Sequence, residues 1–295
     1  MTLPDSREPG GNERGMILIN VLVIVMLAAA VLAIMLAGED ADLERSTRLR
    51  QGAQAMAIAR GAELSAVAAL RRDLASGSTT DSRDEAWAHI ADQDVAIEGG
   101  RFSFGVSDAQ ALFNLNGLTR GDALTRATFQ DIAIAAGIDL ALAERFAAEA
   151  PTGGPIDDLA LLGKLGVGPD DLRRIARFCT VLPGATTVNL NTAPERVIAA
   201  LFRNPEIARK IVTLQARRGG ITYSDITAAG IVLPPGTGLS SQYFWARSKV
   251  RIGETGQQLT SLLTRRIAQG KPEVVAIRRW RGRPPLQAPE LDKVP

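Results

Sequence analysis

The sequence predicts an α+β protein: a long N-terminal helix, transmembrane in its first half, packed on a small antiparallel sheet, with a large all-α domain inserted between strands. Three observations support this fold class. The chain opens with an apolar stretch that continues into an amphipathic one. Alternating apolar and polar residues, which indicate strands, occur before residue 110 and again after residue 240. The interval between them is helical in pattern, so strands, helices and strands follow in order.

The first element is an apolar run at residues 16–37 that is long enough to cross a membrane. As a helix of about 22 residues it would extend roughly 33 Å, and the hydrocarbon core of a bilayer is about 30 Å thick. A cleavable secretory signal has a shorter apolar stretch, of about 7–15 residues. Arg7 and Arg14 precede the run, whereas four acids, beginning with Glu39, follow it before the next arginine. The positive-inside rule therefore places the rest of the chain outside the cytoplasm.

The helical pattern continues beyond this run. Apolar residues recur near a 3.6-residue period as far as Leu74, and no proline occurs between Pro9 and Pro151. The first clear terminator is the SGSTT stretch at residues 76–80. One helix of about 60 residues is therefore expected, with a second half that can pack on its own domain.

Strands are indicated at residues 94–98 and 101–107, and Gly99-Gly100 between them is a two-residue hairpin turn. The strand pattern returns at residues 242–252, 261–267 and 274–280. Helical patterns lie between, at residues 128–138, 140–150, 157–165, 170–182, 194–202 and 205–217. This order predicts an inserted α-helical domain, which we place at residues 117–236. The proline-rich residues 282–295 are expected to be a disordered tail.

The residue types that support catalysis are scarce. Cys179 is the one cysteine and His89 the one histidine, and the formal net charge is +2. These counts exclude an intrachain disulfide, a zinc cluster and a Cys/His pair, and no pattern supports a serine triad around His89. The sequence also has no phosphate-binding Gly-Lys-Ser/Thr loop. We therefore predict no catalytic residue and no enzymatic activity, with Cys179 as a small buried hydrophobe.

Two stretches share an Asn-Leu-Asn motif, DAQALFNLNGL at residues 108–118 and VNLNTAPERVIAAL at residues 188–201. The shared asparagines are Asn114, Asn116, Asn189 and Asn191. Asparagine amides can bind turn backbone, so a structural role is expected for all four. After the second motif, Thr192 and Glu195 have the spacing of a capping box at the start of a helix.

Basic residues gather near the C-terminus. Arg247, Lys249 and Arg251 alternate along one expected strand, which places three cations on one of its faces. The face is either a solvated outer surface or a surface for an acidic partner.

Four stretches, in order, resemble the K-type minor pseudopilins of the type II secretion system (general secretion pathway protein K). They are RGMILINVLVIVML, DAQALFNLNGL, VNLNTAPERVIAAL and SQYFWARSKVRI, and together they span most of residues 14–281. The resemblance implies a pilin-like fold with a helical insertion and a non-enzymatic role at the tip of the pseudopilus. There the subunit would initiate or cap the pseudopilus and support export of folded proteins across the outer membrane. It also implies structural roles for the motif residues, Asp108 among them.

The same resemblance implies partners and a location. The partners would be the I- and J-type minor pseudopilins, the major pseudopilin and the prepilin peptidase, with a secreted substrate or the secretin channel as a further contact. The chain would be a single-pass protein of the bacterial inner membrane with a periplasmic C-terminal domain. Calcium is implied by the resemblance alone, and no Asp-rich loop spacing identifies a ligand, so no metal site is assigned.

Family boundaries complete the expected organisation. They are a prepilin leader at 1–15, the transmembrane half of the helix at 16–37, its periplasmic half at 38–75, the first strands at 76–116, the inserted α-helical domain at 117–236, the second strands at 237–281 and the tail at 282–295. By resemblance, prepilin peptidase would cut between Gly15 and Met16, and the new terminus could be methylated. An ordinary signal anchor, with Gly15 as a junction residue, is the alternative.

Asn20 would be the fifth residue after that cut, where most pilins carry Glu and the K-type family does not. In the pilins that carry it, the acid is thought to pair with the terminal amine of a neighbouring subunit. An uncharged Asn is less costly in lipid than an unpaired acid. A subunit without the acid fits the position that begins the filament. The alternative is a polar residue tolerated near the end of an anchor.

A membrane-anchored DNA-binding or DNA-uptake protein is the rival function. The glycine-rich residues 162–169 resemble the hairpin of a helix-hairpin-helix motif, which presents backbone N–H groups to phosphate. Asp170 and Asp171 directly follow the hairpin and would repel phosphate, although Arg173 and Arg174 come soon after. No nucleic acid is therefore expected as a partner.

Overall fold

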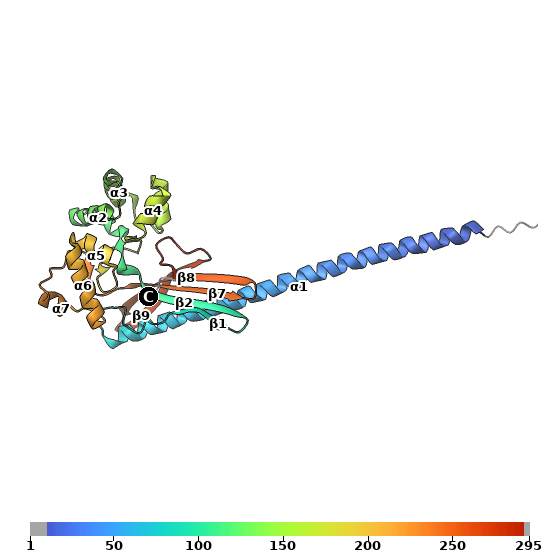
Figure 1. The fold of residues 1–295 in the computed structure, drawn as a ribbon, viewed down its shortest axis with the longest axis horizontal. Coiled ribbons are helices and arrows are strands. Elements are labelled where there is room, and N and C mark those ends of the chain that lie inside the picture. Colours follow the sequence, from blue (N-terminus) through green and yellow to red (C-terminus); the bar gives the residue numbers. More distant parts are fainter. Residues whose placement is uncertain (1–10, 292–295) are drawn as a thin grey trace, which may run out of the picture. The chain divides into compact units, whose positions relative to one another are not determined.

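The computed structural model describes residues 11–291 of the 295-residue chain. These residues form two compact units, one up to Ala53 and one from Gln54 onward. A single helix, α1 (Gly11–Ser76), runs through both units (Figure 1). Residues 1–10, which include most of the expected leader, lie outside the described residues.

The first unit consists of the N-terminal part of α1. Its segment Met16–Leu36 has a mean hydropathy of 3.1 and no buried residue. Among the described residues it is the helix that could cross a membrane by length and composition. Apolar side chains all round a helix are what a lipid environment requires.

The second unit is built on a five-stranded antiparallel sheet of strand order β1-β2-β7-β8-β9. The strands are β1 (Asp92–Ile97), β2 (Gly100–Asp108), β7 (Tyr243–Ile252), β8 (Thr255–Ala268) and β9 (Lys271–Arg281). β2 and β7 are neighbours although about half of the chain separates them, with a register that pairs Phe102 with Val250. A hairpin joins β1 and β2 as expected, but its turn is Glu98-Gly99, one residue earlier than predicted, because Gly100 already pairs with Ile97.

The second part of α1 packs on one face of this sheet through small side chains. Ala55, Ala59, Ala62, Ala66 and Ala69 recur every three or four residues and are all buried. Alanines let the helix backbone approach the sheet closely, so the larger apolar groups come from the other side of the interface. These groups are Trp87 of the connecting loop and, from the sheet, Phe104, Phe244, Leu263 and Val274.

Ion pairs cross this interface, and one of them joins buried Glu63 to a half-exposed arginine. Glu63 of α1 lies 2.8 Å from the guanidinium of Arg279 in β9 and also accepts a hydrogen bond from Ser261. Burial acts to raise the pKa of Glu63, but the hydrogen bonds from Arg279 and Ser261 outweigh it and lower the pKa overall. The carboxylate therefore stays charged at neutral pH.

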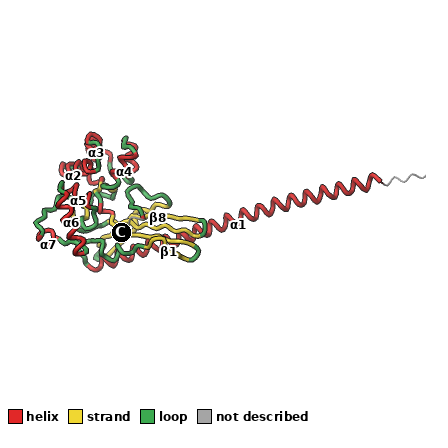
Figure 2. The backbone as a smooth tube through the Cα atoms, in the orientation of Figure 1, coloured by secondary structure: helices red, strands yellow, loops and turns green. Residues whose placement is uncertain are grey.

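The chain leaves the sheet after β2, forms a helical block and returns at β7; Figure 2 shows its red helices grouped apart from the yellow sheet. The helices are α2 (Ala123–Ala135), α3 (Leu140–Gly153), α4 (Pro169–Ile175), α5 (Glu195–Phe202), α6 (Pro205–Arg218) and α7 (Tyr223–Ala228). One apolar core joins them. The predicted fold class, α+β with helices inserted between strands of one sheet, is confirmed.

Two parallel bridges close the block. β3 (Phe113–Asn114) pairs with β4 (Cys179–Thr180), and β5 (Val188–Asn189) pairs with β6 (Thr237–Gly238). The helix expected at residues 170–182 is therefore wrong beyond Ile175. Phe178 O accepts a hydrogen bond from Phe113 N at 2.9 Å, so the backbone there serves the bridge.

The segment after β9 differs from the expected disordered tail over residues 282–291. Gln287 is buried, and its Oε1 accepts a hydrogen bond from Leu159 N at 3.3 Å. The backbone oxygen of Pro289 accepts from Arg247, and that of Leu291 accepts from Gln93 Nε2 at 3.0 Å. Side-chain amides and a guanidinium order this segment, and proline content does not reveal such contacts.

Candidate functional site

The two Asn-Leu-Asn motifs lie in equivalent turns of the helical block. In the first, Asn114 Oδ1 accepts from Asn116 N at 3.1 Å and from Leu182 N at 3.0 Å. The amide of Asn116 forms a reciprocal pair with Ile156, donating to its O at 2.9 Å and accepting from its N at 2.9 Å. Both asparagines are buried.

The second turn repeats this pattern. Asn189 Oδ1 accepts from Asn191 N at 3.0 Å, and Asn191 forms the reciprocal pair with Ile221 at 3.0 and 2.8 Å. Leu190, between the two amides, is fully buried. An amide can donate and accept at once, which satisfies an otherwise orphaned backbone N–H and C=O together. Each motif therefore fixes a loop far away in the chain.

Asp108, the last residue of β2, is the point where the sheet and the helical block meet. One carboxylate oxygen accepts from Gln110 N at 2.7 Å. The other accepts from Asn189 Nδ2 at 2.8 Å, Thr192 Oγ1 at 2.5 Å and Ser241 Oγ at 2.6 Å. Burial raises the pKa of Asp108, and the hydrogen bonds it accepts act in the opposite direction. Asp108 therefore links residues of both motif stretches to Ser241, which precedes β7.

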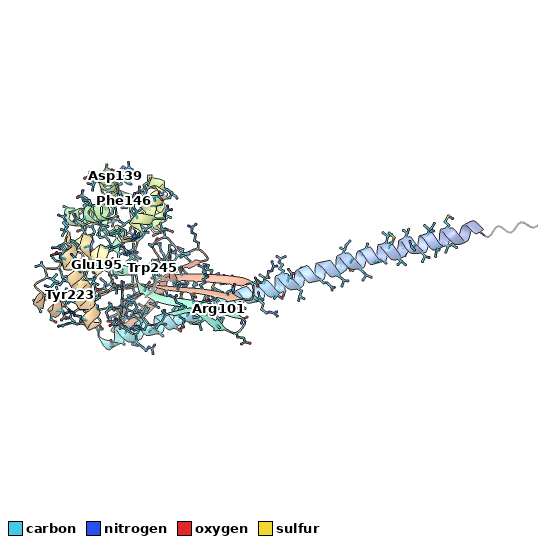
Figure 3. All side chains as sticks on the ribbon, in the orientation of Figure 1. Arg101, Asp139, Phe146, Glu195, Tyr223 and Trp245 are labelled. Atoms are coloured by element: carbon cyan, nitrogen blue, oxygen red, sulfur yellow. The ribbon has the colours of Figure 1, made fainter. Side chains whose placement is uncertain are left out.

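The expected capping box at Thr192 and Glu195 is wrong. α5 has Pro194 at its N-cap with no side-chain cap bond, and the hydroxyl of Thr192 points instead to Asp108. Glu195 lies exposed in the first turn of α5, where it can still favour the helix dipole (Figure 3). Leaving the buried carboxylate of Asp108 without this donor would cost more free energy than leaving the N-terminus of α5 without a side-chain cap.

A second buried cluster surrounds Arg265 of β8. Its guanidinium pairs with Asp73 and Asp81, and its Nε donates to Ser241 O at 2.9 Å. Ser241 N in turn donates to Asp81 at 2.6 Å, which connects this cluster to Asp108. Burial raises the pKa of Asp81 to about 6 despite Arg265, and the charge of Asp108 adds to the rise.

This cluster also holds the carboxylates most suited by position to a cation. Among the described residues, Asp73, Asp81 and Glu85 form the group of acids whose oxygens lie within 4.8 Å of one another. Arg265 already neutralises the two aspartates, and Glu85 accepts from Trp87 Nε1 at 2.7 Å. Calcium needs several free oxygens at once, so these residues do not fit it.

The structure separates the three cations of the expected basic strand. All three alternate with buried residues on β7, but Arg247 is itself buried and donates to Pro289 O. Lys249 and Arg251 are exposed, and Arg101 of the neighbouring strand lies opposite Arg251. Figure 3 labels Arg101 at the hairpin end of the sheet. Arg247 is therefore an internal contact, and the expectation that it faces a partner is wrong.

The helix-hairpin-helix resemblance is weakened by the ion pairs of α4. Arg173 pairs with Asp170, and Arg174 pairs with Asp171. The two arginines nearest the hairpin are thus paired with acids of the same helix. Burial raises the pKa of the Cys179 thiol, so no thiolate is available, and His89 is exposed.

Residues of the proposed processing site lie on α1. The Gly15–Met16 peptide falls within this helix, and Met16 and Asn20 are exposed on its surface.

Three residues of the buried cluster, Asp81, Ser241 and Arg265, were not predicted as site residues from the sequence. Ser241 begins the SQYFWARSKVRI stretch, which was one available signal, whereas Asp81 and Arg265 are marked by no pattern.

Both the sequence and the fold of the chain are similar to those of known proteins. No protein-family model matches the chain. The chain is 28% identical to type II secretion system protein K of Pseudomonas aeruginosa over 307 aligned residues, which cover 90% of this chain and 92% of the relative. A chain in the crystal structure of the GspK-GspI-GspJ complex of the enterotoxigenic Escherichia coli type 2 secretion system has a TM-score of 0.64 and 17% identity, covering 81% of this chain and 100% of the other. The chain is therefore a homologue of type II secretion system protein K with a GspK-like fold.

Proposed function

We propose that the protein is a non-enzymatic minor pseudopilin at the tip of the type II secretion pseudopilus. There it forms a complex with the I- and J-type minor pseudopilins, initiates or caps the pseudopilus and supports export of folded proteins. The main observation in support of this role concerns α1. This helix is apolar over Met16–Leu36 and then packs on a sheet whose strands are separated in sequence by the helical block. A repeated block of this size would obstruct a tightly wound fibre, whereas a tip position leaves it free.

The proposed location is the bacterial inner membrane, single-pass, with the second unit in the periplasm. Charge asymmetry around the apolar segment supports this orientation. Prepilin peptidase would cut between Gly15 and Met16, and Asn20 would then leave the subunit without the acid that pairs with an incoming amine. Mass spectrometry of the mature protein tests the cut. A start at Met16 supports it, and retention of residues 1–14 overturns it.

Co-purification of the full chain with I- and J-type minor pseudopilins from the same organism tests the tip role. We expect a stable ternary complex from co-expressed subunits in detergent. Failure of the three to co-purify, with each subunit folded, would refute the proposal. A salt-dependent gel shift of the purified protein with duplex DNA would favour the rival function.

Lys249 and Arg251 are the proposed partner-facing cations. The double variant Lys249→Gln/Arg251→Gln should weaken assembly with an acidic partner and reduce its sensitivity to salt, because exposed charges act through screened attraction. The matched control is Arg217→Gln/Lys271→Gln, which removes the same charge from exposed positions elsewhere. Equal behaviour of both variants would leave the strand as a solvated face.

A deletion of residues 117–236 is not a suitable test of the helical block. It would remove Asn189 and Thr192, two of the donors to Asp108, and Leu182, which packs on Trp245 of the sheet. Loss of secretion in that variant would report an unfolded sheet. Surface substitutions on the block address its role without this ambiguity.

A further inference from the structure

A cavity of about 580 Å³ opens between the sheet, the helical block and the C-terminal segment. Its apolar part includes Trp87, Val106 and Trp245, all of them buried. Residues 286–290 form one wall. Figure 3 labels Trp245 on the sheet near the helical block. The volume lies within the range of about 300–1,000 Å³ typical of ligand sites.

The lining is positively charged. It includes Arg83, Arg177 and Arg196 against two acids, Asp108 and Glu290. Asp108 is already enclosed by its four hydrogen-bond donors. Across the described part of the chain, none of the three arginines is in an ion pair. Arg83 donates to Thr192 O at 2.5 Å, so the two exposed residues Arg177 and Arg196 are the guanidinium groups that favour an anion here.

Two of these arginines are held close together. Arg196 Nε donates to Arg177 O at 3.0 Å, and its guanidinium lies 5.9 Å from the centre of the Phe178 ring. Burial lowers the pKa of Arg196, and the charge of Arg177 lowers it further. An anion bound between them would offset this repulsion.

Thr180 supplies an independent observation. Its side chain is fully buried and lines the same cavity, and its Oγ1 has no hydrogen-bond partner among the described residues. A buried hydroxyl that lacks a hydrogen-bond partner destabilises the fold. A carboxylate accepts both from a hydroxyl and from guanidinium groups. The hydroxyl and the arginines therefore share one complementary ligand group.

We propose that this cavity binds an acidic peptide segment of a protein partner. Its carboxylate would accept from Arg177, Arg196 and Thr180, and a neighbouring apolar side chain would contact Trp87 and Trp245. Inorganic phosphate lacks the apolar group that the tryptophans complement. The inference goes beyond the tip role and does not depend on it.

The test uses the full chain in a non-ionic maltoside detergent and isothermal titration with two peptides, acetyl-Leu-Asp-Leu-amide and acetyl-Leu-Asn-Leu-amide. We expect the Asp peptide to bind at least about tenfold more tightly, because hydrogen bonds to a charged carboxylate are stronger than those to a neutral amide. Arg196→Gln should weaken the Asp peptide by about tenfold and Thr180→Val by a smaller factor. Arg217→Gln, an exposed change on α6 outside the cavity, should have no effect.

Equal affinity for the two peptides would overturn the proposal, as would unchanged binding by Arg196→Gln with a native melting temperature. Competition by inorganic phosphate decides between sources of the anion. If phosphate displaces the Asp peptide at equal concentration, the cavity is a general anion site and the peptide assignment fails. Co-purification with the I- and J-type subunits is a separate readout, so failure of either proposal can be recognised by itself.

Discussion

Asp108 shows how one buried carboxylate can determine where two parts of a chain meet. Its donors come from residues 110, 189, 192 and 241, so they reach it from the end of the sheet, the helical block and the start of β7. Only a group with several acceptor sites and no obligatory donor satisfies all four. The same network continues through Ser241 to Asp81 and Arg265.

Asp108→Asn is expected to destabilise the second unit by about 2–4 kcal/mol, because the new NH₂ group would face donors that need an acceptor. Urea unfolding of a soluble fragment that begins at Leu43 measures the change. Asp122→Asn is the matched control. Asp122 caps α2 by accepting from Thr125 N at 2.8 Å, and Asn caps equally well. Equal stability of the two variants would show that Asp108 is not a junction residue.

Glu85 makes stability depend on pH. Burial raises its pKa from 4.5 to about 7, and the charges of Asp73 and Asp81 add to the rise. The folded state therefore holds the proton more tightly than the unfolded chain. The contribution of this group is fully favourable below about pH 4.5 and is lost as pH rises towards 7.

Glu85→Gln should remove this loss while keeping an acceptor for Trp87 Nε1. We expect the variant to match the parent at pH 4 and to be more stable by about 1 kcal/mol at pH 8. Thermal unfolding across this range measures the difference. Glu254→Gln, at an exposed turn, should leave the pH profile unchanged. A parent-like profile in Glu85→Gln would contradict the assignment.

At the scale of elements, α1 uses two different kinds of surface. The segment Met16–Leu36 is apolar all round, whereas the part after Gln54 buries a stripe of alanines together with Glu63 and exposes its arginines. The stripe sets the distance between helix and sheet. Because the alanines allow the helix to pack closely on Phe104 and Phe244, no space remains there for a larger side chain.

Ala66→Leu should therefore cost about 1–3 kcal/mol through overpacking against the sheet. Ala68→Leu, two residues later on the exposed face, should change the free energy of unfolding by less than about 0.5 kcal/mol. Both substitutions keep a good helix former, so a difference between them reports packing alone. Indistinguishable urea midpoints would refute the close contact of this face with the sheet.

At the scale of the whole molecule, the helical block and the sheet behave as parts of one unit. Both contribute to the cluster of Ala109, Leu182, Trp245 and Leu262, and all described residues from Gln54 onward form a single compact unit. The C-terminal segment reinforces the junction. It binds the block through Gln287 and Leu159 and the sheet through Pro289 and Arg247.

Gln287→Ala should lower stability by about 1–3 kcal/mol, because Leu159 N would lose its acceptor in a buried setting. Hydrogen exchange at Leu159 should accelerate together with the loss of stability. Gln54→Ala, an exposed substitution on α1, is the control and should be neutral. Unaltered exchange at Leu159 would show that the segment does not bridge the two parts.

Local patterns explain which elements could be predicted. The hairpin between β1 and β2 and the strands near the C-terminus follow from alternation over a few residues. The predicted end of the fourth helix failed because Cys179 and Thr180 pair with β3, a contact that spans more than sixty residues. α7 was missed although Thr222 and Asp225 form a capping box, which is a local signal that could have identified it.

The order of apolar, alternating and helical segments determined the membrane segment and the α+β class, because both depend on short-range periodicity. The residue composition determined the scarcity of catalytic groups. The tertiary structure alone decided that Arg247 is internal, that Thr192 serves Asp108 and that residues 282–291 are ordered. These outcomes depend on which distant polar groups share a buried space. Desolvation makes their pairing obligatory, and no local pattern records the identity of the partner.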